Sequence, residues 1–333
     1  MLSMRLLSLA ALAAAGPVRS ANEYIRALKN PTIQGVSEAD VDNFAFYAEH
    51  CGASYCNSED GEVGAAITCG GNCPTLEANG VTILATFDGT WSGIAAYLSV
   101  DEVREELVLS TRGSSNILNW ISNIDFILVD SPLTTDAKVH DGFDNAWNEM
   151  YEDVTAALAA ALETYPGYSI VSTGHSLGGA VAMLAGGQLR NDGHAVEIYT
   201  YGAPRIGNAV VSDYISAQSG NEFRITHLDD PVPRLPPIIF GYRHTSPEYW
   251  LSVSESTGED YPIDEIQVCP GNDNVDCNAG TFGLNTAAHG TYFGPIAECT
   301  NVAAALKAAQ DDAELEERLN GWVQEDIDFV GGA

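Results

Sequence analysis

The pentapeptide Gly174-His175-Ser176-Leu177-Gly178 joins two segments of opposite character. Residues 168–173 include the β-branched Ile170, Val171 and Thr173 and predict a buried strand, and residues 179–185 are small and apolar, as in a closely packed helix. A serine at a sharp strand-to-helix turn needs a strained backbone, and flanking glycines let strand and helix approach closely. The pattern predicts an α/β chain that presents Ser176 as a nucleophile. The alternative is a small-residue turn after a core strand.

Strands and helices alternate through the middle of the chain, which is typical of a mostly parallel central sheet flanked by helices. The 333 residues fit one large domain of this class. The tail from about Val302 is rich in alanine and acidic residues and predicts one or two helices outside the central fold. Predicted strands cover 81–87, 93–100, 106–111, 196–201 and 223–228, and predicted helices cover 36–51 and 147–165.

The chain is strongly acidic, with 46 Asp and Glu against 14 Lys and Arg and a net charge of −32. Nucleic acid is excluded as a partner because its phosphates require Lys and Arg. The same charge opposes tight adsorption to anionic membranes, and its simplest role is to keep the protein soluble.

Residues 1–20 have the features of a secretory signal peptide. Arg5 precedes the short apolar run 6–15, and the residues near Ser20 offer an imperfect cleavage site. The apolar run is too short to cross a bilayer and no later run is long enough, so we expect a secreted chain without a transmembrane segment. Residues 21–35 are either a pro-segment or an ordered N-terminal arm, and both interpretations stay open.

Seven cysteines in a chain expected to be secreted predict disulfides with one thiol left over. Spacing predicts a Cys69–Cys73 bridge that closes a small loop and a Cys269–Cys277 bridge around a turn-rich segment. A zinc site is disfavoured, because no C-x-x-C or H-x-x-x-H pair accompanies His50 and the cysteine after it. Three cysteines remain whose pairing the spacing does not decide: Cys51, Cys56 and Cys299.

A catalytic serine needs a base within hydrogen-bond reach and a carboxylate that fixes the tautomer of that base. In chains with a nucleophilic serine at such a strand-to-helix turn, the catalytic carboxylate follows the serine and precedes the histidine in the sequence. Asp229 and Asp230 follow a predicted strand, and functional residues of open α/β sheets lie at the carboxyl ends of the strands. His289 lies late in the chain on a loop before aromatic residues, which suits a base. His227 is expected to be a packed strand residue, and His175 is expected to point away from the nucleophile.

Two backbone donors are expected to face the oxyanion that forms during acyl transfer. One is the N–H of Leu177, which follows the nucleophile. The other is Ser114, which follows the predicted strand 106–111 and offers both an N–H and a hydroxyl. The alternative for Ser114 is an ordinary Gly-Ser turn.

The segment 115–123 follows this loop and carries four large apolar residues in about one helical turn between polar ends. They are Ile117, Leu118, Trp120 and Ile121. A short apolar segment beside the oxyanion loop predicts a lid that covers the site in water and contacts lipid when it opens. The alternative is a connecting helix packed on the core.

Taken together, these residues resemble the filamentous-fungal class 3 triacylglycerol lipases. The matching segments occur in the order of that family between about Phe44 and Cys299. They are 111–114, 119–121, 140–143, 174–179, 201–208, 232–237, 241–242, 246–250, 288–289 and 292–294. The chain departs from some members in having no small disulfide between the lid and His140, and in the proline that follows Asp230.

The resemblance implies an α/β-hydrolase fold over residues 36–301, followed by an acidic helical extension over 302–333 that is either retained or processed. It implies a triad of Ser176, Asp230 and His289, and it favours Asp230 over Asp229 because the family acid lies two residues before a Val-Pro-Arg-Leu-Pro run. It also implies Ser114 and Leu177 as oxyanion donors and a lid centred on Trp120. The remaining implied feature is a Cys56–Cys299 disulfide, which leaves Cys51 unpaired.

We therefore expect a secreted carboxylic ester hydrolase that acts on acylglycerols at an oil–water interface, without a metal or an organic cofactor. The nearest alternatives on the same fold are a feruloyl or other soluble-substrate esterase and a phospholipase. An apolar lid favours lipid over soluble substrates. A binding or adhesion protein with an inactive hydrolase fold is disfavoured, because every expected catalytic group is present.

Overall fold

A computed structural model describes residues 35–58, 61–90, 92–114, 117–253, 261–297 and 312–332. The predicted signal peptide and nearly all of the segment 21–35 lie outside the described residues, as do residues 302–311 of the predicted extension. All described residues belong to one compact unit, Ile33–Ala333. Among them, no helix is both long and apolar enough to cross a membrane.

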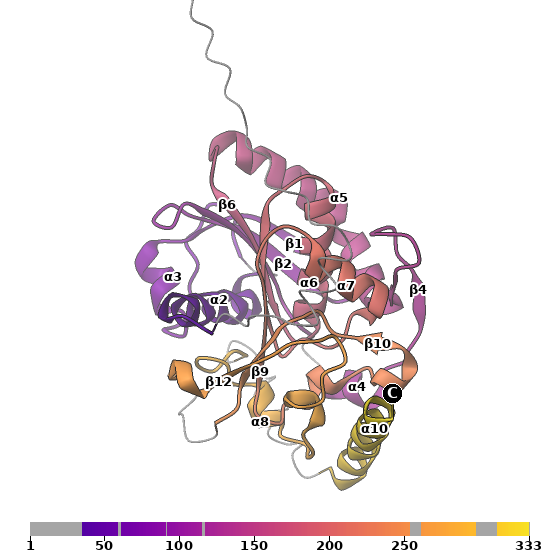
Figure 1. The fold of residues 1–333 in the computed structure, drawn as a ribbon. Coiled ribbons are helices and arrows are strands. Elements are labelled where there is room, and N and C mark those ends of the chain that lie inside the picture. The colour runs from indigo at the N-terminus through magenta and orange to yellow at the C-terminus, as the bar shows by residue number, and fades with distance from the viewer. Residues whose placement is uncertain are drawn as a thin grey trace, which may run out of the picture. The chain divides into compact units, whose positions relative to one another are not determined.

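The centre of this unit is an eight-stranded sheet with the strand order β1-β2-β3-β6-β7-β9-β11-β12 (Figure 1). Neighbouring strands are parallel from β3 to β11, and β1, β2 and β12 complete the two edges in antiparallel pairings. The strands are β1 (Thr82–Asp88), β2 (Ala95–Asp101), β3 (Glu106–Thr111), β6 (Ser169–His175), β7 (Val196–Tyr201), β9 (Glu222–His227), β11 (Glu248–Leu251) and β12 (Ile266–Cys269). This is the mostly parallel sheet that the alternation of elements predicts.

A second, small sheet has the order β10-β8-β5-β4. Its strands are β4 (Leu128–Asp130), β5 (Lys138–His140), β8 (Gly207–Asn208) and β10 (Tyr242–Arg243). The α-helices are α2 (Glu38–Asn57), α3 (Pro74–Asn79), α4 (Ile117–Asn123), α5 (Asp141–Thr164), α6 (Leu177–Asn191), α7 (Ala209–Ala217), α8 (Thr286–His289) and α10 (Ala313–Gly331). Three short 3₁₀ helices matter for the site: η1 (Val232–Arg234), η2 (Ile238–Phe240) and η4 (Asn278–Gly280).

Both faces of the large sheet are covered, because alternate residues of each strand point to opposite faces. Leu107 and Leu109 of β3 belong to the core cluster that also holds buried residues of α5 and α6. Val108 between them belongs to the other cluster, which is formed with α2 and α3. In Figure 1, α2 and α3 accordingly lie on one side of the sheet and α5 and α6 on the other.

Two helices are longer than the sequence predicts. Helix α5 begins at Asp141 rather than at Trp147, because the side chain of His140 accepts a hydrogen bond from the Gly142 amide and caps the helix. Helix α2 continues to Asn57 rather than ending near residue 51, and its later turns remain buried against the sheet. The first turn of α5 and the last turns of α2 contain polar and small residues, so the spacing of apolar residues did not reveal that the helices extend this far.

The disulfides Cys69–Cys73 and Cys269–Cys277 are both present in the structure. Cys56 is also disulfide-bonded, but Cys299, its predicted partner, lies outside the described residues. The Sγ of Cys51 is buried 3.2 Å from the hydroxyl of Thr173.

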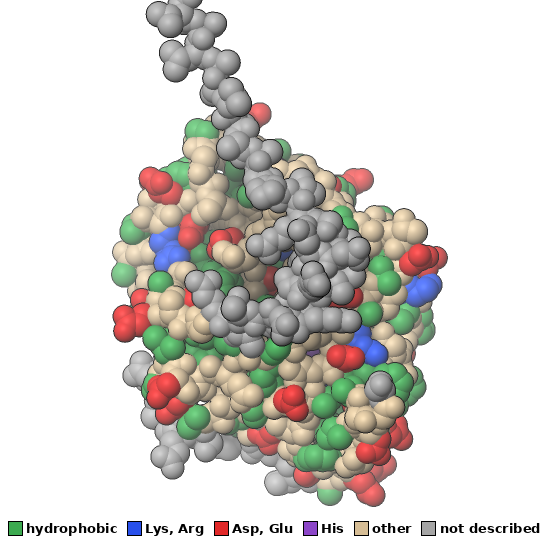
Figure 2. Space-filling model, in the orientation of Figure 1, with side chains coloured by type: hydrophobic (Ala, Val, Ile, Leu, Met, Phe, Trp, Pro, Cys, Tyr) green, Lys and Arg blue, Asp and Glu red, His purple; other side chains and the backbone are tan. Residues whose placement is uncertain are grey.

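The C-terminal helix α10 packs on the rest of this unit. Leu315 and Leu319 are buried in the same cluster as residues of α5 and α6. Figure 1 shows α10 beside α4, and Arg318 donates a hydrogen bond to the Ile121 carbonyl of that helix at 3.3 Å. Figure 2 shows carboxylates scattered over this face of the molecule, with few Lys and Arg groups among them.

The carboxylate of Asp326 fixes the far end of α10. It is 2% exposed and accepts hydrogen bonds from the amides of Ile238 at 2.9 Å and Ile239 at 3.0 Å. It also lies 3.4 Å from the Nη1 of Arg205, which is itself buried. Burial lowers the pKa of Arg205 to about 10, and the negative charge of Asp326 opposes that shift.

Replacing Asp326 with alanine should lower the free energy of unfolding by about 3–5 kcal/mol, because it leaves a buried guanidinium without its counter-ion. Urea denaturation of the purified protein measures this change. The matched control is Glu325→Ala, since Glu325 is exposed on the same helix, and we expect its effect to stay below about 0.5 kcal/mol. Equal stability of the two variants would contradict a structural role for the Asp326 contacts.

Candidate active site

Ser176 lies at the turn between β6 and α6, in the strained conformation that the sequence predicts. Its backbone has φ 60° and ψ −133°, an unusual combination for a residue with a side chain. The flanking glycines are required by close approach: a Cβ on Gly174 would lie 2.3 Å from the Gly178 carbonyl oxygen, and one on Gly178 would lie 2.2 Å from that of Thr111. The sharp turn therefore holds the serine hydroxyl above the end of the strand.

Three polar side chains from distant parts of the chain meet at this turn. The Nε2 of His289 lies 2.9 Å from the Oγ of Ser176. The Nδ1 of the same ring lies 3.0 and 2.9 Å from the two carboxylate oxygens of Asp230. All three residues are at most 1% exposed.

The carboxylate fixes the tautomer of His289. Because a carboxylate only accepts hydrogen bonds, the ring carries its proton on Nδ1 and presents a free lone pair on Nε2 to the Ser176 hydroxyl. This arrangement can remove the hydroxyl proton as the oxygen attacks an electrophilic carbon. It is the geometry of covalent acyl transfer.

The structure separates the two adjacent aspartates. Asp230 contacts His289, whereas the Asp229 carboxylate accepts a hydrogen bond from the side chain of Asn285 at 2.7 Å. The side-chain oxygen of Asn285 in turn caps helix α8, which ends at His289. Asp229 therefore supports the loop that carries the histidine, whereas Asp230 reaches its ring.

Tyr292 is a further polar contact of the carboxylate that sequence reasoning did not single out. Its hydroxyl donates a hydrogen bond to the Oδ2 of Asp230 at 2.6 Å, and the backbone N–H of Val232 donates to the Oδ1 at 2.9 Å. Burial raises the pKa of Tyr292 well above its usual range, so the hydroxyl stays protonated and remains a donor. The only indication in the sequence was that this tyrosine lies three residues after His289.

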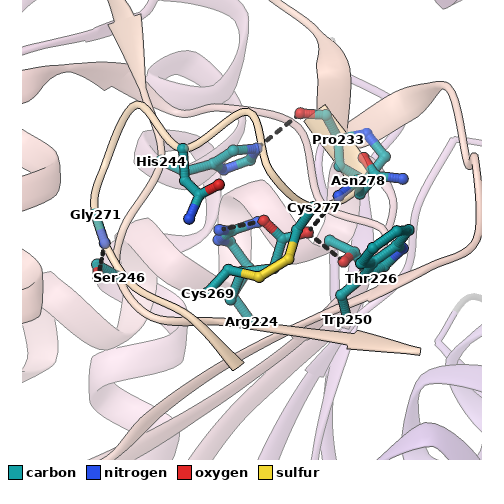
Figure 3. Close-up of polar contacts among 12 residues, drawn as sticks. Arg224, Thr226, Pro233, His244, Ser246, Trp250, Cys269, Gly271, Cys277 and Asn278 are labelled. Carbon is teal, nitrogen blue, oxygen red and sulfur yellow. Dashed lines mark hydrogen bonds and ion pairs between the residues drawn. A yellow bond between two sulfur atoms is a disulfide. The ribbon is translucent and has the colours of Figure 1, made fainter. Parts of the chain in front are cut away.

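A buried polar cluster supports the backbone of the Asp230 loop from below (Figure 3). The side-chain amide of Asn278 donates hydrogen bonds to the carbonyls of Leu228 and Asp230, both at 3.1 Å. The indole N–H of Trp250 donates to the same Leu228 carbonyl at 2.8 Å. These bonds tie the loop to β11 and to η4, which follows the Cys269–Cys277 bridge.

The Glu248 carboxylate sits at the centre of the same cluster and is 1% exposed. It lies 3.2 Å from the guanidinium of Arg224 and accepts hydrogen bonds from the Thr226 hydroxyl and the backbone N–H of Asn278. Figure 3 shows the side chains of Arg224 and Thr226 converging on this carboxylate. The buried charge is therefore paired and hydrogen-bonded, as a stable interior requires.

Of the two residues expected to face an oxyanion, Leu177 follows the serine in the chain, and Ser114 belongs to a loop whose Gly113 approaches it. Leu177 is the first residue of α6, so no carbonyl one turn earlier accepts its amide within the helix. Gly113, which precedes Ser114, approaches the serine so closely that a Cβ on it would lie 3.1 Å from the Cβ of Ser176. Ser114 and Trp120 line a hollow together with residues of the segment 123–125 and of the His140-Asp141-Gly142 turn.

The predicted lid segment is a helix. In α4, Ile117 is 2% exposed and Ile121 is fully buried, so both face the interior in this structure. Trp120 is partly buried and stacks on Phe143, with 6.1 Å between ring centroids. The side chain of Leu118 lies outside the described part of the chain.

His227 is a packed residue, in agreement with its position in a strand. Its Nδ1 lies 3.1 Å from the Ala288 carbonyl, and its Nε2 lies 3.1 Å from the hydroxyl of Tyr261. Burial lowers the pKa of His227, and both ring nitrogens are occupied away from Ser176.

Known proteins resemble this chain over most of its length. The sequence profile of the family described as "Lipase (class 3)" matches residues 108–240. The "Secreted mono- and diacylglycerol lipase 1" of Fusarium solani is 46% identical over 331 residues, covering 99% of this chain and 98% of the relative. The "Secreted mono- and diacylglycerol lipase A" of Penicillium cyclopium is 38% identical over 266 residues, covering 78% of this chain and 86% of the relative.

Solved structures agree with the sequence matches. The crystal structure of a mono- and diacylglycerol lipase from Aspergillus oryzae has a TM-score of 0.75 at 33% identity, covering 80% of this chain and 100% of that one. A structure titled "An unusual buried polar cluster in a family of fungal lipases" has a TM-score of 0.75 at 37% identity, covering 79% of this chain and 99% of that one. Because identity and fold agree over so much of its length, the chain belongs to the class 3 lipases of the α/β-hydrolase fold.

Proposed function

We propose that this protein is a secreted lipase that hydrolyses acylglycerol esters at an oil–water interface. Ser176 is the nucleophile, His289 the general base and Asp230 the carboxylate that orients the base. The observation that carries the proposal is the unbroken series of hydrogen bonds from the Asp230 carboxylate through His289 to the Ser176 hydroxyl. Secretion and the preference for acylglycerols are supported by the names of the Fusarium and Penicillium relatives.

The reaction follows from the direction of these hydrogen bonds. His289 takes the hydroxyl proton on Nε2 while the Ser176 oxygen attacks the ester carbonyl, and Asp230 stabilises the imidazolium that forms. The Leu177 amide and Ser114 stabilise the oxyanion of the tetrahedral intermediate. The imidazolium then protonates the departing alcohol. Water, activated by the same histidine, releases the fatty acid from the acyl-enzyme.

A lipid substrate is favoured over a soluble one by the residues above the site. The α4 helix carries Ile117, Trp120 and Ile121, which would contact acyl chains when the helix moves aside. A feruloyl esterase would need a more polar flap, so this helix argues against that alternative. Residues 1–20 are proposed to direct secretion. Residues 302–333 are proposed to be retained, since the packing of α10 buries part of them.

A series of mono-, di- and triacylglycerols and phospholipids of increasing chain length tests the proposal. Hydrolysis is measured below and above the solubility limit of each ester. We expect the rate on long-chain acylglycerols to rise where droplets form, because an aggregated substrate favours the open lid. Saturation on soluble aryl esters with no response to droplets would instead identify a soluble-substrate esterase, and faster release from phospholipids would identify a phospholipase.

Replacing Trp120 with serine should reduce the rate on emulsified long-chain substrate by about 10-fold, since it removes apolar area worth roughly 1.5 kcal/mol at the interface. The rate on a short soluble ester should change by less than about threefold. The control is Val103→Ser, which removes an exposed apolar residue at the turn between β2 and β3. Equal losses on both substrates would contradict an interfacial lid.

A further inference from the structure

His175 precedes the nucleophile at the strand-to-helix turn, and both nitrogens of its ring form hydrogen bonds. It is 1% exposed at the end of β6. Its Nε2 lies 2.8 Å from the main-chain carbonyl oxygen of His289, and its Nδ1 lies 2.9 Å from the hydroxyl of Tyr55. The rings of His175 and His289 contact each other, with 4.5 Å between centroids and 35° between their planes.

The partners of this ring fix its protonation and tautomer. The His289 carbonyl can only accept, so the Nε2 of His175 carries the proton and donates it. The Nδ1 is then an acceptor, and the Tyr55 hydroxyl donates to it. Burial, together with the neighbouring His289, lowers the pKa of His175 well below its usual range. A neutral ring therefore faces the imidazolium that His289 becomes during catalysis.

Tyr55 connects this ring to the oxyanion loop. It lies on α2 next to the disulfide-bonded Cys56 and is 7% exposed. A Cβ on Gly113 would come within 2.6 Å of the Tyr55 hydroxyl oxygen, so the loop backbone lies directly against it. Burial raises the pKa of Tyr55, and a hydrogen bond from the Gly113 backbone opposes that shift. The hydroxyl thus accepts from the oxyanion loop and donates to His175.

The main chain of His289 needs such support. Helix α8 is a single turn, Thr286–His289, and a single turn has little stability of its own in the absence of external contacts. Asp230 fixes the ring of His289 but does not contact its main chain through the bonds described above. Catalytic geometry is sensitive to displacement, and a shift of about 1 Å can reduce a rate by about 100-fold.

We propose that Tyr55 and His175 are positioning residues, which hold the main chain of the general base and the oxyanion loop in fixed register with Ser176. The inference rests on the triad assignment above. It predicts a loss in kcat rather than in KM, because the hydrogen bonds of the pair reach the His289 main chain and the Gly113 backbone, which position the reacting groups.

Three variants test the proposal on a soluble short-chain ester. His175→Leu removes both hydrogen bonds and should lower kcat by about 100-fold, with KM changed by less than about threefold. His175→Gln keeps a donor near the Nε2 position and should recover kcat to within about 10-fold of wild type. Tyr55→Phe removes the donor to Nδ1 and should lower kcat by about 10-fold.

Helix α2 offers a matched control in a second buried histidine–tyrosine pair. The Nδ1 of His50 lies 2.8 Å from the hydroxyl of Tyr97, a residue of β2. Tyr97→Phe removes a comparable buried hydroxyl and should leave kcat within about twofold, whatever its effect on the urea midpoint. Equal losses of kcat in Tyr55→Phe and Tyr97→Phe would show that Tyr55 and His175 contribute only packing and would contradict the proposal.

The outcomes separate this inference from the triad assignment. If a serine-directed organophosphate labels Ser176 in wild type but His175→Leu keeps full kcat, the positioning role is wrong and the triad stands. If wild type is not labelled at all, the triad assignment fails first. If His175→Leu does not fold, the comparison of His175→Gln and Tyr55→Phe with Tyr97→Phe decides: wild-type kcat in both overturns the proposal.

Discussion

Ser176→Ala should lower kcat for ester hydrolysis by about 10⁶-fold while the protein remains folded. No other described group occupies the position 2.9 Å from the Nε2 of His289, so the covalent step loses its nucleophile. The residue is 1% exposed, and alanine lacks only the hydroxyl oxygen of serine, so it fits without a new clash. The measurement is initial rate on a soluble ester, with circular dichroism and a urea midpoint to verify folding.

Ser172 provides the control on the same strand. Its hydroxyl is buried and donates to the Ala182 carbonyl at 2.8 Å, away from His289. Ser172→Ala should cost about 1 kcal/mol of stability and leave kcat within about twofold. Retention of more than about one-thousandth of wild-type kcat in Ser176→Ala, free of contaminating esterase, would refute the assignment of the nucleophile.

Asp230→Asn should lower kcat by about 10⁴-fold, equivalent to about 5.5 kcal/mol of transition-state stabilisation. The amide that replaces the carboxylate can donate to the Nδ1 of His289, which moves the ring proton to Nε2. The lone pair that should accept the Ser176 proton is then lost. The imidazolium also loses its counter-charge in a site from which water is excluded.

Asp229→Asn is the matched control for this prediction. The side-chain oxygen of asparagine can still accept the hydrogen bond from Asn285, so we expect a loss of about threefold or less. Steady-state kinetics on the same ester compares the two variants. A larger loss in Asp229→Asn than in Asp230→Asn would exchange the roles of the two aspartates.

Local features were predictable because they depend on neighbours in the chain. The turn at Ser176 follows from two glycines and from the change of pattern between 168–173 and 179–185. The Cys69–Cys73 bridge follows from a separation of four residues. Helix α4 was likewise expected from its own apolar spacing.

Contacts over long separations were harder to predict from the residues alone. The sequence placed both Asp229 and Asp230 past the end of a strand, and the choice between them came from family resemblance. Asp230 and His289 are 59 positions apart in the chain, and hydrogen bonds from η4 to the Asp230 carbonyl and between β9 and α8 help to bring them together. The Asp326 carboxylate was not anticipated as a buried anchor, because acidic residues in a helical tail are usually exposed.

The sequence by itself determined the turn at Ser176 and the alternation that produces a mostly parallel sheet, since backbone strain and apolar periodicity act over a few residues. The tertiary structure alone decided that Tyr292 donates to Asp230, that His175 contacts the main chain of His289 while Tyr55 contacts His175, and that α10 is held by Asp326. Such bonds form only where folding has removed water from groups far apart in the chain, and no local pattern encodes which groups will meet.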